Sequence, residues 1–414
     1  MDLAISSRIF ADFPQEIVDA IIDTLCDDTS SLIACSLVCR RFLPRAQVHL
    51  FSTVALAHQH QCVTFHSLIQ SSPYISLNVK TLKLRCGFST PNRNAWDITY
   101  EPLLQPIIRA ASNLEKLYLS SILCPLPSDT NSPLSSIFSC SLTSLELHSV
   151  RFADFKHLCS FARAWPTLKS FTCSGQMYTH TVPCEHKHPP GPLVEWLDID
   201  GAYGRTDILD NIISSGICPV SVGMLRSLVF PIHEKQDIER LRALTKLCTD
   251  TLRNLHIIHN KSSVPFRLPP DLAHQRFKVG SLRRLTIEVY AKSEGSDSSL
   301  LDWWINSIGA AEILEDITFK YFIEEGAVST EIAKPLWRKM DSTLSRLTAL
   351  RMFAFNIVCW GYTVPDRGSP GEDSLSFESR DKLEKLRRAL NESFKLLRVR
   401  GVVTNTTVEI DDYL

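Results

Sequence analysis

The sequence is poor in glycine, with 15 residues in 414, and it lacks the short motifs that hold phosphates or catalytic groups. It contains no Walker A loop, no Gly-x-Gly-x-x-Gly fingerprint, no Gly-x-Ser-x-Gly, no His-Glu-x-x-His and no Cys-x-x-Cys pair. Phosphate-cradling loops and nucleophile elbows depend on such patterns. We therefore expect neither an enzyme nor a bound cofactor.

Neither the net charge nor the distribution of apolar residues indicates a nucleic-acid or membrane partner. The chain has 44 basic and 45 acidic residues, a net charge of −1, so no overall field attracts it to nucleic acid or anionic lipid. It has no uninterrupted apolar run of about 18 residues and no signal-peptide pattern. Its 13 cysteines are odd in number and irregular in spacing, which favours reduced thiols over a disulfide framework. We expect a cytoplasmic or nuclear protein without a membrane or nucleic-acid partner.

One insert carries a group of metal-ligand types, His180, Cys184, His186 and His188. Zinc binds nitrogen and sulfur tetrahedrally, but this spacing matches no standard zinc finger. The residues are expected to be solvated loop side chains, and no metal site is predicted. A catalytic cysteine would need a nearby histidine and a third orienting group, and sequence proximity alone does not support one.

The most informative stretch, residues 13–50, predicts three short helices with a dense apolar side. Pro14 suits the first turn of a helix, because its missing N–H costs nothing there. Ile17 and Ile21 recur at a four-residue step in a broad aliphatic stripe. Residues 27–30 end this helix and supply capping oxygens for the next. A piece of under about 40 residues cannot bury all these groups alone, so part of the stripe is expected to contact another protein.

This stretch resembles an F-box. The family opens with Leu-Pro-x-Glu-Ile, for which this chain has Phe13-Pro14-Gln15-Glu16-Ile17, with Phe13 the main departure. The family continues with Leu-x-x-Cys-x-x-Val-Cys-[Arg/Lys] and an aromatic residue two positions later. Those positions are filled by Leu32, Cys35, Val38, Cys39, Arg40 and Phe42. The resemblance covers about 40 residues, and it implies an F-box domain at 10–52 that binds the adaptor subunit of an SCF-type cullin–RING ubiquitin ligase.

The residues predicted to contact the adaptor are apolar and match the family pattern. They are Phe13, Pro14, Ile17, Ile21, Leu32, Val38 and Phe42. Some of them, above all Ile21 and Leu32, could instead close the small core of the module. An alternative is that these helices only cap a larger domain.

The rest of the chain repeats one unit, apolar-x-x-apolar-x-apolar, ten times. The middle residues of the units are Leu82, Leu117, Leu145, Phe171, Leu197, Leu228, Leu255, Leu285, Ile317 and Phe353. They recur about every 30 residues, and the alternation within each unit is typical of a short strand with one buried face.

Stretches of helical period lie between these units, at 101–111, 154–164, 207–215, 238–247, 300–308 and 332–347. Strand and helix at a regular recurrence predict an α/β solenoid over 53–414, with strands on the concave side and helices outside. The pattern resembles the leucine-rich-repeat class of F-box proteins. An amphipathic helix at 380–397 is expected to cap the stack. Inserts at 124–133, 178–192, 261–280 and 361–379 are expected to be loops.

A doubly wound α/β domain is the alternative fold. It predicts longer apolar strands and a Gly-rich phosphate loop, and the sequence has neither. Within 300–308, one of Trp303 and Trp304 is expected in the core and the other at the surface.

Side chains between the buried anchors of a strand point to the opposite face, which in a solenoid is the concave binding face. We predict that a target protein contacts these positions, with basic residues first and acidic residues in the middle. They are Lys83, Arg85, Tyr118, Glu146, His148, Asp198, Asp200, His256, Glu288 and Lys320.

The resemblance implies a substrate receptor of an SCF-type ligase. Its partners would be the adaptor, through it the cullin, and an unidentified protein target. Two rivals are a leucine-rich-repeat scaffold without a ligase and an α/β hydrolase, which the missing nucleophile elbow disfavours.

Overall fold

The computed structural model describes part of the chain in twelve ranges and one single residue. These are residues 13–86, 98, 101–124, 137–175, 190–200, 205–214, 218–259, 276–277, 280–291, 298–309, 311–324, 330–360 and 377–411. The chain forms two compact units. The first consists of Met1–Val194, Gly201–Ile208 and Ser215–Ser221, and the second of Glu195–Asp200, Leu209–Ser214 and Val222–Leu414.

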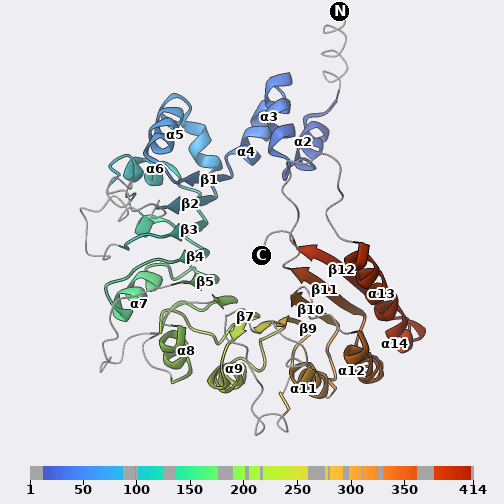
Figure 1. Ribbon diagram of the computed structural model, residues 1–414. Helices are drawn as coiled ribbons and strands as arrows, with labels where there is room; N and C mark the ends of the chain where they lie inside the picture. Colours follow the sequence, from blue (N-terminus) through green and yellow to red (C-terminus); the bar gives the residue numbers. More distant parts are fainter. Residues whose placement is uncertain are drawn as a thin grey trace, which may run out of the picture. The chain divides into compact units, whose positions relative to one another are not determined.

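The first unit begins with three helices and continues with alternating strands and helices (Figure 1). Its elements are α2 Gln15–Asp23, α3 Thr29–Val38, α4 Leu43–Leu50, β1 Thr53–Leu56, α5 Gln59–Ser71, the 3-10 helix η1 Pro73–Asn78, β2 Thr81–Arg85, α6 Leu104–Ala110, β3 Lys116–Ser120, β4 Ser144–His148, α7 Phe155–Arg163 and β5 Ser170–Ser174.

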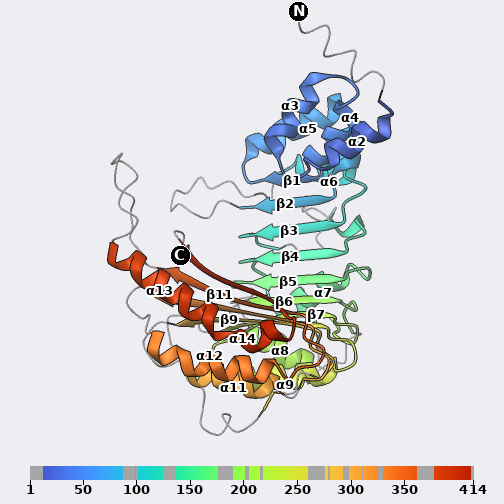
Figure 2. The same cartoon turned by 90° about the vertical axis from the view of Figure 1, so that its right-hand side faces the viewer.

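Strands β1 to β5 pair in sequence order, and each pair described is parallel. Figure 2 shows the arrows of β2 to β5 pointing the same way. The predicted anchors share one register row, Leu82 with Leu117, Leu145 and Phe171. All four are buried. Because identical positions of successive repeats stack, each repeat buries its apolar face against its neighbours.

The ends of β3, β4 and β5 share a left-handed backbone turn. The residue after each strand has a positive φ: Ser121 at 56°, Ser149 at 52° and Gly175 at 80°. The Cβ atoms of Ser121 and Ser149 disfavour this conformation, whereas Gly175 has no Cβ and adopts it easily. The recurrence shows that the repeat extends to the backbone turn that leaves each strand.

The second unit consists of longer strands alternating with helices. Its elements are β6 Trp196–Asp200, β7 Ser227–Ile232, α9 Lys235–Leu247, β8 Asn254–His259, β9 Arg284–Ala291, α11 Ser298–Ile308, β10 Asp316–Glu324, α12 Thr330–Leu344, β11 Met352–Trp360, α13 Phe377–Ser393, α14 Lys395–Val399 and β12 Val403–Asp411. Helix α8, Arg205–Ile213, has residues in both units.

Strands β6 to β12 also pair in parallel and in sequence order. The anchors again form one row, Leu197, Leu228, Leu255, Leu285, Ile317 and Phe353. All ten predicted strands and the α/β class are therefore confirmed. Each of the six predicted helical stretches also contains a helix.

Two strands were missed by the repeat pattern. Strand β1 carries Val54 and Leu56 in register with Leu82 and Leu84, so Phe51 opens an eleventh matching unit. In β12, Thr404 lies opposite Phe353, at the anchor position. Because threonine is polar, a pattern of apolar anchors does not detect this strand. Helix α5 and η1 were also not predicted.

The predicted capping role of residues 380–397 is wrong. Helices do form there, but β12 follows them and pairs with β11. Helix α13 packs against both α12 and β12, so it occupies the position of another repeat helix. The last described element of the stack is a strand.

The domain boundary expected after residue 52 does not coincide with the division into compact units. The three N-terminal helices belong to the same unit as β1 to β5, and α4 packs against η1. A functional module at 10–52 stays a prediction. The expected inserts lie mainly outside the described residues.

Both tryptophans of α11 are buried, which corrects the expectation that one would be exposed. Trp303 and Trp304 pack edge to face with ring centroids 4.8 Å apart. Trp304 Nε1 donates a hydrogen bond of 2.8 Å to Nε2 of His259, which is completely buried. The hydrogen bond to His259 satisfies the indole N–H of Trp304, so the second tryptophan can also be buried.

We predict that His259 makes the second unit sensitive to acid. Burial, and secondarily the neighbouring His233, lowers the pKa of His259 from 6.5 to about 3. Protonation therefore favours the unfolded chain below pH 6.5, and stability falls by about 1.4 kcal/mol per pH unit. Urea unfolding followed by tryptophan fluorescence at about pH 7.5 and about pH 5.5 should show this loss.

The control is His259→Gln, which keeps an acceptor for Trp304 but cannot be protonated. Its unfolding free energy should change less between the two pH values than that of the wild type. Equal changes would show that other groups cause the acid sensitivity.

Candidate functional site

The predicted site residues fall into three groups, one on the N-terminal helices and one on the strand face of each unit. The strand residues between the buried anchors form what we call the open face of a unit.

The N-terminal helices have a small core of their own. The core consists of Val18 and Ile22 of α2, Leu32 of α3, Ala46 of α4, and Phe42, which directly precedes α4. On α2 the core residues directly follow Ile17 and Ile21, so filling the core leaves these two outside. Ile17 and Ile21 are 45% and 47% exposed.

Polar contacts fix α2 against the later helices. The Arg41 guanidinium donates to the Phe13 carbonyl at 2.6 Å and to Gln15 Oε1 at 3.2 Å. At the other end of α2, Asp23 accepts from Arg45 Nη2 at 2.7 Å and contacts His49 Nε2 at 2.7 Å. Hydrogen bonds from Arg45 and then His49 lower the pKa of Asp23 to about 2. Ile17 and Ile21 therefore lie on a helix whose orientation these polar contacts fix; we call the three helices with these contacts the frame.

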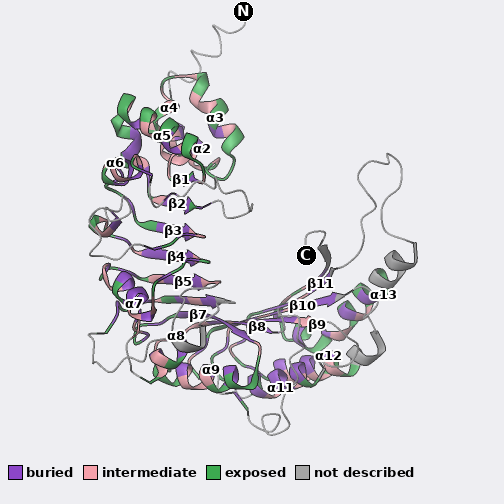
Figure 3. Ribbon diagram, turned by 60° about the vertical axis from the view of Figure 1, so that its left-hand side comes forward, coloured by how far each residue is buried: buried purple, intermediate pink, exposed green. Residues whose placement is uncertain are grey.

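A set of apolar side chains remains outside this frame. Phe13 is exposed, and α3 adds Ile33, Leu37 at 81% and Val38 at 63%. Ile33 and Leu37 are four residues apart and so share one helix face. In Figure 3, large parts of α2 and α3 have the colour of exposed residues. We call Phe13, Ile17, Ile21, Ile33, Leu37 and Val38 the apolar patch.

Two predicted contact residues need correction. Leu32 and Phe42 are buried in the module's core, so they support the patch from inside. The alternative that Ile21 and Leu32 close the core is confirmed for Leu32 and wrong for Ile21, because Val18 and Ile22 fill the core from α2. Ile33 and Leu37 were missed, although their four-residue spacing was a usable signal. Pro14 is exposed, as is Val38.

On the open face of the first unit, five predicted residues come together on β2, β3 and β4. Lys83, Tyr118 and Glu146 share one register row, and Arg85 and His148 belong to the next. Lys83 and Arg85 are exposed and make no ion pair or side-chain hydrogen bond with any described residue. They are available to a partner.

An aromatic pair marks the centre of this group. Tyr118 stacks on His148 with ring centroids 4.6 Å apart. His148 Nδ1 lies 2.6 Å from Ser174 Oγ, and its Nε2 lies 3.9 Å from Glu146 Oε2. The contact with His148 lowers the pKa of Glu146. Ser174 was not predicted, but it lies in register with His148.

The open face of the second unit holds a charged cluster of three predicted residues. Glu288 Oε1 lies 2.8 Å from Lys320 Nζ and 3.0 Å from His256 Nε2. Burial alone would raise the pKa of Glu288, but His256 and Lys320 together outweigh it and lower the pKa to about 2. This carboxylate is already neutralised within the protein, so it is not a free acidic contact for a basic target.

Polar and aromatic residues that were not predicted surround this cluster. Glu288, Lys320, Asn356 and Thr407 form one register row across β9 to β12. Asn356 Oδ1 and Thr407 Oγ1 are buried and have no hydrogen-bond partner among the described residues. Two positions along, Tyr290 and Phe322 stack with centroids 4.2 Å apart. The period-2 alternation identified these positions once the strands were aligned.

The residues of the predicted acidic centre are divided between the two units. Glu146 belongs to the first unit and Asp198 to the second. Asp198 is half-buried on β6, and the side chain of Asp200 lies outside the described residues.

The candidate metal ligands His180, Cys184, His186 and His188 lie outside the described residues. The part of the chain that the structure describes contains no group of three or more metal-ligating side chains. None of its described helices is long and apolar enough to cross a membrane. The chain matches no protein-family model, and comparison with curated proteins gives no match.

We predict that Glu288→Gln lowers the unfolding free energy of the second unit by about 2 kcal/mol near neutral pH, because a buried ion-pair partner is lost. The folded pKa lies below the ordinary 4.5, so the carboxylate stabilises the fold above that pH and this contribution is lost as pH falls toward 2. The difference between variant and wild type in urea unfolding should shrink over the same range.

Glu384→Gln serves as the control, since Glu384 pairs with Arg388 on an exposed helix face. Exposed pairs contribute little, about 0–1 kcal/mol. Equal losses in both variants would contradict a special role for the buried cluster.

Proposed function

We propose that the protein is a substrate receptor of an SCF-type cullin–RING ubiquitin ligase. In this proposal the N-terminal helices bind the adaptor subunit, and the open strand faces bind a protein target. The observation that carries the proposal is the apolar patch on α2 and α3, at the position of the F-box resemblance.

The patch is unusual because the module already has a filled core. Exposed apolar residues scattered singly are normal, but several exposed on two short helices of one small module favour an interaction site. Burying apolar surface contributes about 25 cal/mol per Å². Leu37 and Val38 are expected to gain most, since they are the most exposed members of the apolar patch.

The open faces support the second half of the proposal. In the second unit, the open face carries the Lys320 ammonium beside the stacked Tyr290 and Phe322 rings. In the first unit, Lys83 and Arg85 beside the Tyr118–His148 pair offer charge and an aromatic surface. Such mixed surfaces are typical of protein-binding sites.

The receptor itself would perform no chemistry. Holding the target and the adaptor on one chain raises the effective concentration of target lysines near the charged conjugating enzyme. The transfer of ubiquitin belongs to the partner subunits.

A second candidate is a repeat scaffold without a ligase, in which the N-terminal helices cap the strands. The contact of α4 with η1 favours it, since this places the helices at the start of the β1 to β5 stack. The two candidates differ in whether the apolar patch is covered by an adaptor.

We predict that the double variant Ile17→Asp/Leu37→Asp loses adaptor binding by about 100-fold or more, because it introduces two charges into an apolar contact. Both residues are exposed in the free protein, so the variant should fold normally by circular dichroism. The measurement is complex formation with the purified adaptor by size-exclusion chromatography and calorimetry.

The matched control is Val63→Asp/Leu77→Asp, which changes two exposed apolar residues of the same unit, on α5 and η1, outside the apolar patch. It should bind the adaptor like the wild type. A folded wild type that never binds the adaptor would refute the receptor proposal and leave the scaffold. Equal losses in both variants would refute the apolar patch as the contact.

A further inference from the structure

The second unit contains a pocket of about 700 Å³ apart from the open strand faces. One wall is the C-terminal part of α9, and the other is the segment that leads into β9. A volume of this size is typical of small-ligand sites. None of the predicted adaptor or target residues lines it.

The charge of the lining is of one sign. Its described residues include Arg242, Lys246 and Arg276, and none of them is acidic. Arg242 and Lys246 are four residues apart on α9 and so share one helix face. The ammonium of Lys246 and the guanidinium of Arg276 make no ion pair or hydrogen bond with any described residue.

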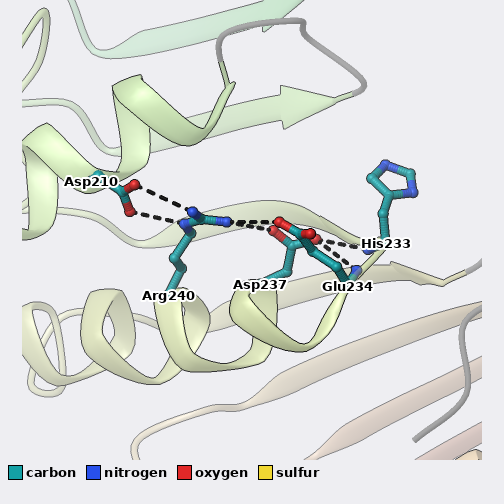
Figure 4. Close-up of polar contacts among 5 residues, drawn as sticks. All are labelled: Asp210, His233, Glu234, Asp237 and Arg240. Carbon is teal, nitrogen blue, oxygen red and sulfur yellow. Dashed lines mark hydrogen bonds and ion pairs between the residues drawn. The ribbon is translucent and has the colours of Figure 1, made fainter.

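Three acidic residues near the start of α9 are engaged by Arg240. Figure 4 shows Arg240 held among three carboxylates, those of Asp210, Glu234 and Asp237. Its Nε lies 2.8 Å from Asp210 Oδ1, and its Nη1 lies 3.3 Å from an oxygen of each of the other two. Arg240 thus pairs with these three carboxylates, and no acidic residue is among the described residues that line the pocket.

The cations are also not needed to cap α9. Helix C-termini attract Lys and Arg because their last carbonyls lack partners. Here Thr249 Oγ1 donates to the Thr245 and Lys246 carbonyls at 3.0 and 3.1 Å, and Cys248 Sγ donates to the Leu244 carbonyl at 3.1 Å. The terminal carbonyls therefore have partners without Lys246.

The walls of the pocket are fixed by packing and by main-chain contacts. Leu252, Phe277 and Leu282 are buried beneath it. The Phe277 N–H donates to Ser307 Oγ at 3.0 Å, and Ser281 Oγ donates to the Leu252 carbonyl at 3.0 Å. Because these walls are already held in place, the pocket loses little conformational entropy when a ligand binds.

We propose that this pocket binds a phosphate group through Arg242, Lys246 and Arg276. Three cations around one cavity match a dianion with three terminal oxygens better than a singly charged carboxylate. The phosphate belongs either to a free small compound or to a phosphorylated side chain of a protein. The pocket functions without the adaptor, so this inference does not depend on the receptor proposal.

The test is calorimetric titration of the full chain with inorganic pyrophosphate at constant ionic strength. Lys246→Gln/Arg276→Gln should weaken binding at least about tenfold, since the variant loses two charge-assisted contacts to the phosphate oxygens. The control is Arg346→Gln/Arg351→Gln, which removes two exposed charges of the same unit outside the pocket lining. It should bind like the wild type, and thermal unfolding should show all variants folded.

Two results would overturn the proposal: no pyrophosphate binding by the wild type at millimolar concentration, or equal weakening in both variants, which would indicate general attraction. A second arm identifies the source of the phosphate. Peptide libraries with a fixed central phosphoserine, or serine as the control, compete with bound pyrophosphate. Competition by the phosphorylated library alone assigns a phosphorylated protein segment, and no competition by either assigns a free phosphate compound.

Discussion

The stacking of equivalent apolar anchors on neighbouring parallel strands is the constraint on which both units depend. No single strand of five or six residues could bury its own anchors. Leu145 is buried because Leu117 and Phe171 lie beside it in register. Stability is then a sum of contacts between adjacent repeats. A weakened anchor should affect its two neighbours before it affects distant strands.

The sequence predicted the strands well because one physical pattern, an apolar residue every second position, was repeated ten times. It failed at β12, where Thr404 occupies an anchor position and only the pairing with β11 reveals the strand. It also failed for Trp304, because the buried acceptor that admits the indole, His259, lies 45 residues away. Pairing between distant positions is not visible in local periodicity.

The candidate site was predicted in outline and corrected in detail. Helical period identified the apolar side of α2 but could not separate Ile17, which is exposed, from Val18, which is in the core. That choice depends on where Leu32 and Phe42 pack. On the strand faces, alternation found Glu288 and Lys320, but the neutral Asn356 joined them only through register. Charged residues attract notice in a sequence, and uncharged members of the same row do not.

The contact between Arg387 and β12 has a consequence for solubility. The Val403 N–H donates to the carbonyl of Arg351, the residue that precedes β11, so by alternation the Val408 carbonyl faces away from β11. No described strand follows on that side. Arg387 Nη2 donates to that carbonyl at 3.0 Å. Free strand edges are templates for aggregation. A strand that paired with β12 would first have to displace this guanidinium from the Val408 carbonyl. Its backbone would then lie next to a positive charge. Arg387 therefore disfavours self-association through this edge.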